Sequence, residues 1–268
     1  MLKERLLTAL FAGAAVLAGL WFLNTAGVGI LLGAVTLLAA FEWSGLVTRR
    51  PAARLAFPAL AALLGWASLL LPLSAVMAVA ILWWVWAADE VFVFRDRVSP
   101  VWRHAPVKYL SGFLVLVPAW RGCVALKAQD PLHPALLIWL LAMVWTADSV
   151  AYFAGRAFGR RRLAPLVSPG KTVEGALAGV AGAAIIGGIG ASWLGVVGLS
   201  AGRGALLGVA VAMSSIVGDL LESKAKRLAA VKDSGHLLPG HGGILDRIDA
   251  LTAAVPLFVW TMRYLGVR

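Results

Sequence analysis

The sequence predicts an all-α polytopic membrane protein with about nine transmembrane helices. Of its 268 residues, 61% are hydrophobic and 14% are charged, whereas soluble globular proteins are nearer half apolar and a quarter charged. The mean hydropathy is +0.87, and apolar runs of roughly 20 residues, the length that crosses a bilayer, recur along the chain. The 12 tryptophans fit this class, because tryptophan favours membrane interfaces.

Four predicted spans form an N-terminal transmembrane region, residues 1–108. They cover 6–23, 27–47, 55–72 and 74–94. The first follows Met-Leu-Lys-Glu-Arg, and we interpret it as a retained anchor because no clear small-residue cleavage site follows it. The fourth carries Asp89 and Glu90 near its end, and such acids are uncommon within spans.

Five further predicted spans form a C-terminal region, residues 109–268. They cover 109–126, 134–154, 174–196, 203–221 and 245–265. The glycine-rich stretch 178–191 predicts close packing between helices. A single cysteine, Cys123, excludes an intramolecular disulfide and a cysteine-rich metal site.

The basic residues orient the predicted spans. The chain has 24 Lys+Arg against 13 Asp+Glu, a net charge of +11. If the N-terminus is cytoplasmic, most of the lysines and arginines fall in cytoplasmic segments, as the positive-inside rule requires. The motif-rich loops 155–173 and 222–244 are then cytoplasmic and the C-terminus lies outside. We attribute the excess charge to topology and anionic lipid, not to nucleic acid, because no polar stretch is long enough for a basic soluble domain.

The end of the eighth span and the start of the ninth carry a pattern of charged residues. In GDLLESKAKR, residues 218–227, helical spacing places Asp219, Glu222, Ser223 and Lys226 on one face. Asp246 and Asp249 repeat a three-residue spacing at the ninth span. Carboxylates of this kind suit magnesium, which is usually held by one or two of them together with substrate phosphates. The alternative is two solvated helix ends with ordinary salt bridges.

The loop between these spans has the composition of a phosphate site. Its glycines, Gly240, Gly242 and Gly243, allow positive φ and close approach of the backbone to a ligand. A helix that begins near Ile244 would offer free amides to an anion. The basic residues around the loop suit phosphate; they are Lys226, Arg227, Lys232 and Arg247. Of the two loop histidines, His241 lies among the glycines and is a better candidate for this site than His236.

A second loop contains Gly170-Lys171-Thr172, which resembles the end of a P-loop. Pro165 stands where a P-loop needs glycine, and no parallel sheet is predicted, so we reject that fold. Ser168, Lys171 and Thr172 precede a predicted helix and can still cradle a phosphate. An N-cap with a topology-setting lysine explains them equally well. Asp148 lies inside an apolar run and is a functional candidate for that reason.

The segment SKAKRLAAVKDSGHLLPGHGGILDRID, residues 223–249, closely resembles the signature of phosphatidate cytidylyltransferases, the CDP-diacylglycerol synthases of bacterial membranes. That signature runs Ser-x-x-Lys-Arg, Lys-Asp, His-Gly-Gly and Asp-Arg-x-Asp. The segments DSVAYFAGRAFGRRR and LVSPGKTVEG are also similar to this family. The first hundred residues match only as generic spans, with Glu42-Trp43 as a feature to which the sequence assigns no role.

The resemblance implies an integral nucleotidyltransferase of the bacterial inner membrane whose site faces the cytoplasm. It would make CDP-diacylglycerol and pyrophosphate from CTP and phosphatidic acid, with Mg²⁺ and room for a second cation, and it leaves a homodimer open. The predicted metal ligands are Asp219, Asp246 and Asp249. The predicted phosphate contacts are Lys226, Arg227, Lys232 and Arg247, with Ser168, Lys171 and Thr172 for CTP and His241 as a contact or orienting group.

Two other functions fit parts of the pattern. A CTP-dependent polyprenol kinase is similar in kind, but the Asp-Arg-x-Asp ending favours the cytidylyltransferase. An ion-coupled transporter would use Asp148, Asp219 and Asp246 within the membrane, near mid-span and in paired repeats. Here the acids gather at one membrane face beside basic loops.

Overall fold

The computed structural model describes residues 13–92, 100–129, 134–195, 199–235, 237 and 242–265, and within them the chain is almost entirely helical. The predicted all-α class is confirmed. The elements are the described part of a first helix, Gly13–Phe22, then α2 Thr25–Val47, α3 Pro51–Ser68, α4 Leu73–Phe92, the 3-10 helix η1 Pro100–Arg103, α5 Ala105–Gln129, α6 Ala135–Phe158, β1 Arg162–Ala164, β2 Ser168–Thr172, α7 Val173–Trp193, α8 Ala201–Leu228 and α9 Leu245–Tyr264.

The long apolar helices indicate a multi-pass membrane protein. Of the helices in the described ranges, six are long and apolar enough to cross a membrane, namely α2, α4, α5, α6, α7 and α8. Helix α9 is not among them, and it carries Asp246, Arg247 and Asp249 in its first two turns. The total of nine spans and the orientation of the termini therefore stay predictions. The division at residue 108 stays a prediction as well.

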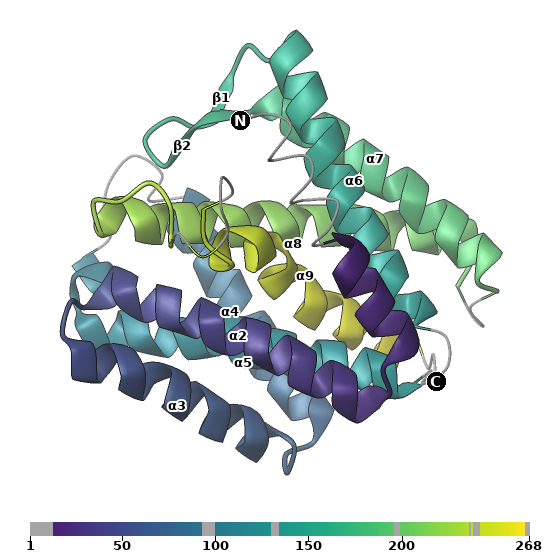
Figure 1. Cartoon of the computed structure of the whole chain (residues 1–268). Coiled ribbons are helices and arrows are strands. Elements are labelled where there is room, and N and C mark those ends of the chain that lie inside the picture. The colour runs from purple at the N-terminus through teal and green to yellow at the C-terminus, as the bar shows by residue number, and fades with distance from the viewer. Residues whose placement is uncertain are drawn as a thin grey trace.

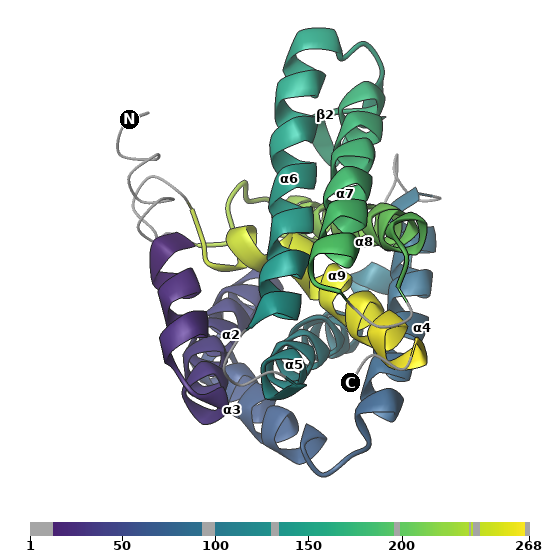
Figure 2. The same cartoon turned by 90° about the vertical axis from the view of Figure 1, so that its right-hand side faces the viewer.

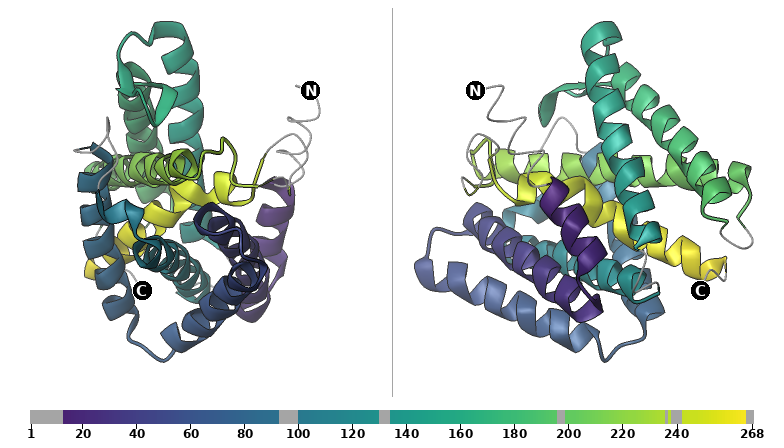
Figure 3. Two further views of the ribbon diagram at one scale, coloured as in Figure 1. Left: turned by 90° about the vertical axis from the view of Figure 1, so that its left-hand side faces the viewer. Right: turned by 45° about the vertical axis from the view of Figure 1, so that its right-hand side comes forward.

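The helices form three groups in space. The antiparallel helices α6 and α7 pack against each other along their length and rise above the other helices (Figures 1 and 2). Helices α2, α3 and α5 pack together on the opposite side, and α8 and α9 lie between the two groups (Figure 3). Helix α4 packs against α5, α8 and α9. This arrangement places α8 and α9 at the centre of the molecule.

Glycine allows α7 and α8 to approach each other closely. A Cβ at Gly187 would lie 2.2 Å from the carbonyl oxygen of Gly204, and one at Gly208 would lie 2.1 Å from that of Ala183. Real Cβ atoms essentially never approach that closely, so neither position tolerates a side chain without movement of a backbone. The close helix packing predicted from the glycine-rich stretch is confirmed for these two helices.

A two-stranded hairpin, which the sequence did not predict, connects α6 and α7. Strands β1 and β2 pair antiparallel, with Arg162 opposite Thr172 and Ala164 opposite Ser168. Thr172 is also the N-cap of α7, and its hydroxyl accepts a hydrogen bond of 3.2 Å from the Gly175 amide. The predicted helix start after this loop is thus confirmed. In Figure 1 the hairpin and the C-terminal end of α8 both lie toward the left-hand side.

A buried apolar cluster among the described residues surrounds this end of the molecule. It includes Trp43 of α2, Leu220 of α8 and Leu245 of α9, each at most 1% exposed. Each of these residues is the immediate neighbour of an acid, since Glu42, Asp219 and Asp246 adjoin them in sequence. The packed core therefore fixes the backbone from which the acidic side chains project.

Candidate active site

The charged residues of α8 share one face, as the helical spacing predicts. The Ser223 hydroxyl donates to Asp219 Oδ1 over 3.3 Å. The Lys226 ammonium lies 2.6 Å from Glu222 Oε2. Helix α8 continues seven residues beyond the predicted span end at 221, so this entire face is helical and is carried on one rigid element.

Helices α8 and α9 meet at the level of the acids. A Cβ at Gly218 would lie 2.5 Å from the carbonyl oxygen of Asp249, so only glycine permits this approach. Asp249 lies within electrostatic range of Asp219, Glu222 and Lys171. Its carboxylate accepts a 2.8 Å hydrogen bond from the Ala250 amide. The structure thus brings Asp219 and Asp249 together from helices that are consecutive in the chain.

Lys226 bridges the two helices. Its ammonium lies 2.5 Å from Asp246 Oδ1 and 2.6 Å from Glu222 Oε2. The three side chains are largely buried, with exposed fractions of 12% for Lys226, 8% for Asp246 and 3% for Glu222. The contact of Lys226 with Glu222 is a short ion pair. Apart from this ion pair, both Glu222 carboxylate oxygens are buried without a hydrogen-bond partner among the described residues.

Lys171 connects the hairpin loop to the acids. Its ammonium forms an ion pair with Asp219 Oδ2, and both side chains are partly exposed. Asp148 of α6 lies within electrostatic range of both partners. Of the predicted phosphate cradle, Lys171 points into the cluster, Thr172 is buried as the cap of α7, and Ser168 is partly exposed at the start of β2. The loop is therefore both an N-cap and a part of the charged site.

The remaining predicted phosphate contacts lie around this cluster on exposed positions. Arg227 donates from Nε to the Val167 carbonyl over 3.2 Å, which ties the end of α8 to the hairpin. Lys232 and Arg247 are exposed, in the following loop and in the first turn of α9. His241 lies outside the described residues.

Glu42 of α2 belongs to this site, although sequence reasoning gave it no role. Its carboxylate accepts hydrogen bonds from the Ile244 amide at 3.0 Å, the Leu245 amide at 2.8 Å and the Ser234 hydroxyl at 3.0 Å. The amides at the start of α9, which the sequence assigned to a substrate anion, therefore bind a carboxylate of the protein itself. In the sequence, the one signal that could have identified Glu42 was the presence of an acid within an apolar run.

Asp246 accepts three hydrogen bonds on Oδ2, the oxygen that does not face Lys226. The donors are the Gly243 amide at 2.8 Å and the amide and hydroxyl of Ser234, each at 3.0 Å. Gly242 has a φ of +80°, a conformation that favours glycine. The predicted role of the loop glycines is confirmed at this position, and the group that the backbone approaches is Asp246.

The donor set of the cluster has the chemistry of a magnesium site. Asp219, Glu222, Asp246 and Asp249 supply carboxylate oxygens, the ligands that hard cations prefer. The buried oxygens of Glu222 without a hydrogen-bond partner fit such a group as well. Among the residues that the structure describes, no three His, Cys, Asp or Glu side chains are grouped to hold one ion. Lysine ammonium groups pair with Asp219 and Asp246 instead.

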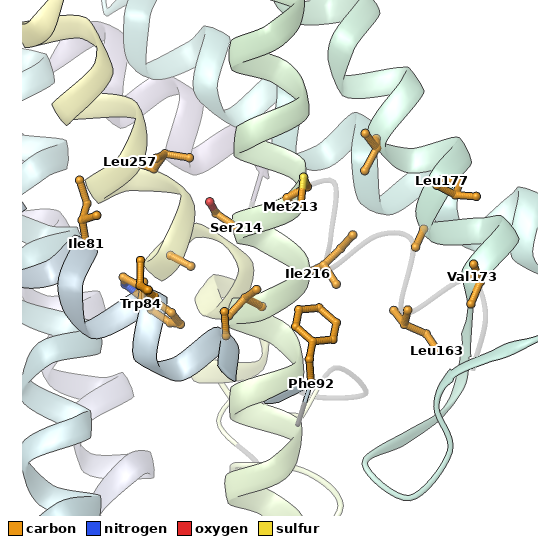
Figure 4. Close-up of a pocket in the computed structure, with 16 residues that line it drawn as sticks. Ile81, Trp84, Phe92, Leu163, Val173, Leu177, Met213, Ser214, Ile216 and Leu257 are labelled. Carbon is orange, nitrogen blue, oxygen red and sulfur yellow. The ribbon is translucent and has the colours of Figure 1, made fainter. Parts of the chain in front are cut away.

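An apolar groove is lined partly by α8 and α9, the helices that carry the acids, and Figure 4 shows the side chains that line it. Its volume is about 470 Å³, and its 16 lining residues come from α4, β1, α7, α8 and α9. Ser214 is the only one of them with a hydroxyl or charged side chain. Ile216 and Val217 precede Asp219 on α8, and Ala253 follows Asp249 by one turn on α9. The groove and the charged cluster therefore lie on adjoining stretches of α8 and α9.

The chain resembles known proteins over nearly its whole length. The sequence model of the cytidylyltransferase family matches residues 3–265. A phosphatidate cytidylyltransferase of Pseudomonas aeruginosa is 44% identical over 262 residues, which cover 96% of this chain and 96% of that protein. One of Haemophilus influenzae is 37% identical over an alignment of 281 residues with gaps, which covers 96% of this chain and 97% of that protein. The chain belongs to the cytidylyltransferase family.

Proposed function

We propose that this protein is a phosphatidate cytidylyltransferase, which joins CTP and phosphatidate into CDP-diacylglycerol and releases pyrophosphate. The observation that carries the proposal is that the charged cluster and an apolar groove lie on adjoining stretches of α8 and α9. A water-soluble polyanion needs the first feature, and a lipid needs the second. Relatives that bear this name match 96% of the chain.

The reaction requires charge neutralisation more than acid–base chemistry. A phosphate oxygen of the lipid attacks the α-phosphorus of CTP. The new P–O bond forms as the bond from the α-phosphorus to the bridging oxygen breaks, and pyrophosphate leaves with that oxygen. The attacking phosphate is already ionised near neutral pH, so no strong base is needed. The protein must bring two polyanions together and stabilise the charge of the transition state.

The basic residues around the cluster suit this task. Lys171, with Ser168 and Thr172 beside it, binds CTP phosphates at the mouth of the site. Arg227, Lys232 and Arg247 contact phosphates of CTP or of the lipid from exposed positions. Lys226 is buried between two carboxylates, so its first effect is to hold Glu222 and Asp246 in place. His241 contacts a phosphate or orients the loop.

Magnesium is the cofactor of this proposal, with room for a second cation. Asp219, Asp246 and Asp249 would hold it, and the buried carboxylate of Glu222 is an additional donor. A bound divalent ion supplies electrostatic stabilisation of phosphate oxygens. Lys171 and Lys226 neutralise the same acids when they are paired with them.

The apolar groove would hold an acyl chain of the lipid. Leu177 and Met213 on its rim are 65% and 59% exposed, and Trp84, Ile216 and Leu257 line its interior. A chain in this groove leads toward Asp219 and Asp249, so the headgroup would lie at the cluster while the tails stay among apolar side chains.

The proposed setting is the bacterial inner membrane, with nine spans and the site at the cytoplasmic face. The ends of α2 and α8 and the starts of α7 and α9 all contribute to the site, and alternation of nine spans would place these four ends at one membrane face. Asp233→Cys should resist an impermeant thiol reagent applied to whole cells, whereas Leu70→Cys should react, each with Cys123 removed. The opposite pattern would invert the orientation. A homodimer stays a prediction.

The direct test is product formation by purified protein in detergent. CTP and phosphatidate with magnesium should yield a CDP-lipid and pyrophosphate in equal amounts. Omission of phosphatidate, or replacement of CTP by ATP, should abolish both products. Formation of CDP and a newly phosphorylated lipid would identify a lipid kinase instead.

A further inference from the structure

Glu42 is a buried carboxylate in the N-terminal part of the chain. Its residue is 3% exposed, in a helix that is otherwise apolar around it. The next residue, Trp43, donates from its indole nitrogen to the Lys108 carbonyl of α5 over 2.9 Å. Ala39 and Ala40, one turn earlier, are fully buried. The backbone of α2 at Glu42 is therefore fixed against the helices around it.

The carboxylate of Glu42 caps the start of α9. Oε1 accepts from the Ile244 amide and Oε2 from the Leu245 amide, so both oxygens are engaged at once. The helix-capping residue itself, Ile244, has no side chain that can do this. A negative charge at a helix N-terminus is favourable, and its hydrogen bonds to backbone amides are of the stronger, charge-assisted kind.

Two glycines before α9, Gly235 and Gly243, lie against the same carboxylate. A Cβ at Gly235 would lie 2.3 Å from Glu42 Oε1, and one at Gly243 would lie 2.4 Å from Oε2. A side chain at either glycine would require the Glu42 carboxylate to move. The backbone at Gly235 and Gly243 therefore lies close to both carboxylate oxygens of Glu42.

Ser234 connects Glu42 to Asp246. Its hydroxyl oxygen lies 3.0 Å from Glu42 Oε2 and 3.0 Å from Asp246 Oδ2. A hydroxyl has one hydrogen, so it donates to one of the two carboxylates at a time. Asp246 in turn contacts Lys226 through its other oxygen. A continuous set of polar contacts thus runs from α2 through the loop and α9 to α8.

We propose that Glu42 is a positioning residue for cytidylyl transfer. Glu42 holds the start of α9 and the loop at Ser234. It thereby fixes the position of the Asp246 carboxylate relative to α8. Glu42 does not itself contact a substrate in this assignment. The inference rests on the proposed function, because it gives Asp246 a part in the reaction.

The first test compares Glu42→Gln with Glu90→Gln. A glutamine has one acceptor oxygen, so it cannot receive the Ile244 and Leu245 amides on two separate oxygens as Glu42 does, and its amino group would face an N–H. Glu90 is an equally buried glutamate of the N-terminal region, paired with Lys224 of α8. Hydrogen exchange of the amides in residues 242–250 should accelerate in Glu42→Gln and not in Glu90→Gln. This readout does not depend on activity.

The second measurement is kinetic. Turnover of Glu42→Gln should fall about 10- to 100-fold, the usual effect of removing a group that orients a ligand residue, with an unchanged KM for phosphatidate. Faster exchange with normal turnover would reduce Glu42 to a structural cap and overturn the proposal, as would no change in either. If Glu42→Gln does not fold, Ser234→Ala decides: reduced turnover supports the proposal, and normal turnover refutes it. A wild-type protein without product formation would refute the proposed function, while the exchange result would still stand.

Discussion

Replacement of Lys226 by methionine tests the central contact of the site. The ammonium lies within 2.6 Å of carboxylates on two helices, and all three side chains are largely buried. Methionine keeps much of the length and apolar character of the lysine stem but removes the charge. Two buried carboxylates would then face each other across α8 and α9 without a cation between them.

The cost falls unequally on the two acids. Removing one partner of a buried ion pair costs about 3–5 kcal/mol, because the other charge stays buried and unpaired. Asp246 keeps the hydrogen bonds from the Ser234 and Gly243 amides, and it shares the Ser234 hydroxyl with Glu42. Glu222 has none among the described residues. Most of the loss should therefore arise at Glu222, and the double variant Glu222→Gln/Lys226→Met should recover most of the stability that Lys226→Met loses.

Thermal unfolding in detergent, followed by tryptophan fluorescence, measures the effect. At roughly 2 °C per kcal/mol for a chain of this size, Lys226→Met should lower the Tm by about 6–10 °C. Lys108→Met, a partly exposed lysine on α5, controls for the loss of a lysine as such and should change the Tm little. A Tm for Lys226→Met equal to that of the control would refute the reasoning. So would a double variant no more stable than the single one.

Three further predictions concern catalysis. Asp246→Asn should lower turnover at least about 100-fold across a magnesium titration, the scale of one lost electrostatic contact to a transition state, and near-normal turnover at ordinary magnesium would exclude a metal role. Lys171→Ala should raise the KM for CTP by about 10- to 150-fold, the equivalent of one charged hydrogen bond, and an unchanged KM for CTP in folded protein would remove Lys171 from the phosphate site. Ala176→Trp, which fills the groove, should raise the KM for phosphatidate but not for CTP, whereas Ile189→Trp on the exposed side of α7 should change neither; equal effects of both would separate the groove from lipid binding.

The sequence predicted local features of the site well. The shared face of Asp219, Ser223 and Lys226 depends only on helical spacing, and the hydrogen bond and ion pair along α8 follow that spacing. The cap at Thr172 is likewise a short-range contact. Such features are encoded within a few residues, so periodicity and residue type suffice to predict them.

Features that depend on distant segments were not predictable in this way. Glu42 lies about 200 positions from the amides it caps, and no local pattern links an acid in one apolar run to the start of another helix. The β1–β2 hairpin has strands of three and five residues, at or below the short end of the range of about four to eight residues over which alternation of apolar and polar residues indicates a strand. It is held partly by Glu174, whose carboxylate accepts from the Arg160 and Arg161 amides at the opposite end of the loop.

The charge balance of the cluster explains why lysines and a divalent ion belong to the same proposal. Asp219, Glu222, Asp246 and Asp249 carry four negative charges when they are ionised, and the ammonium groups of Lys171 and Lys226 supply two positive charges. The net charge of these six side chains is then −2, which one Mg²⁺ would neutralise. A substrate triphosphate brings further negative charge and would attract Lys171 from Asp219, since Lys171 is the more exposed of the two lysines. Lys226, buried between its carboxylates, would stay in place, so the two lysines should differ in kind: one affecting nucleotide affinity, the other the integrity of the site.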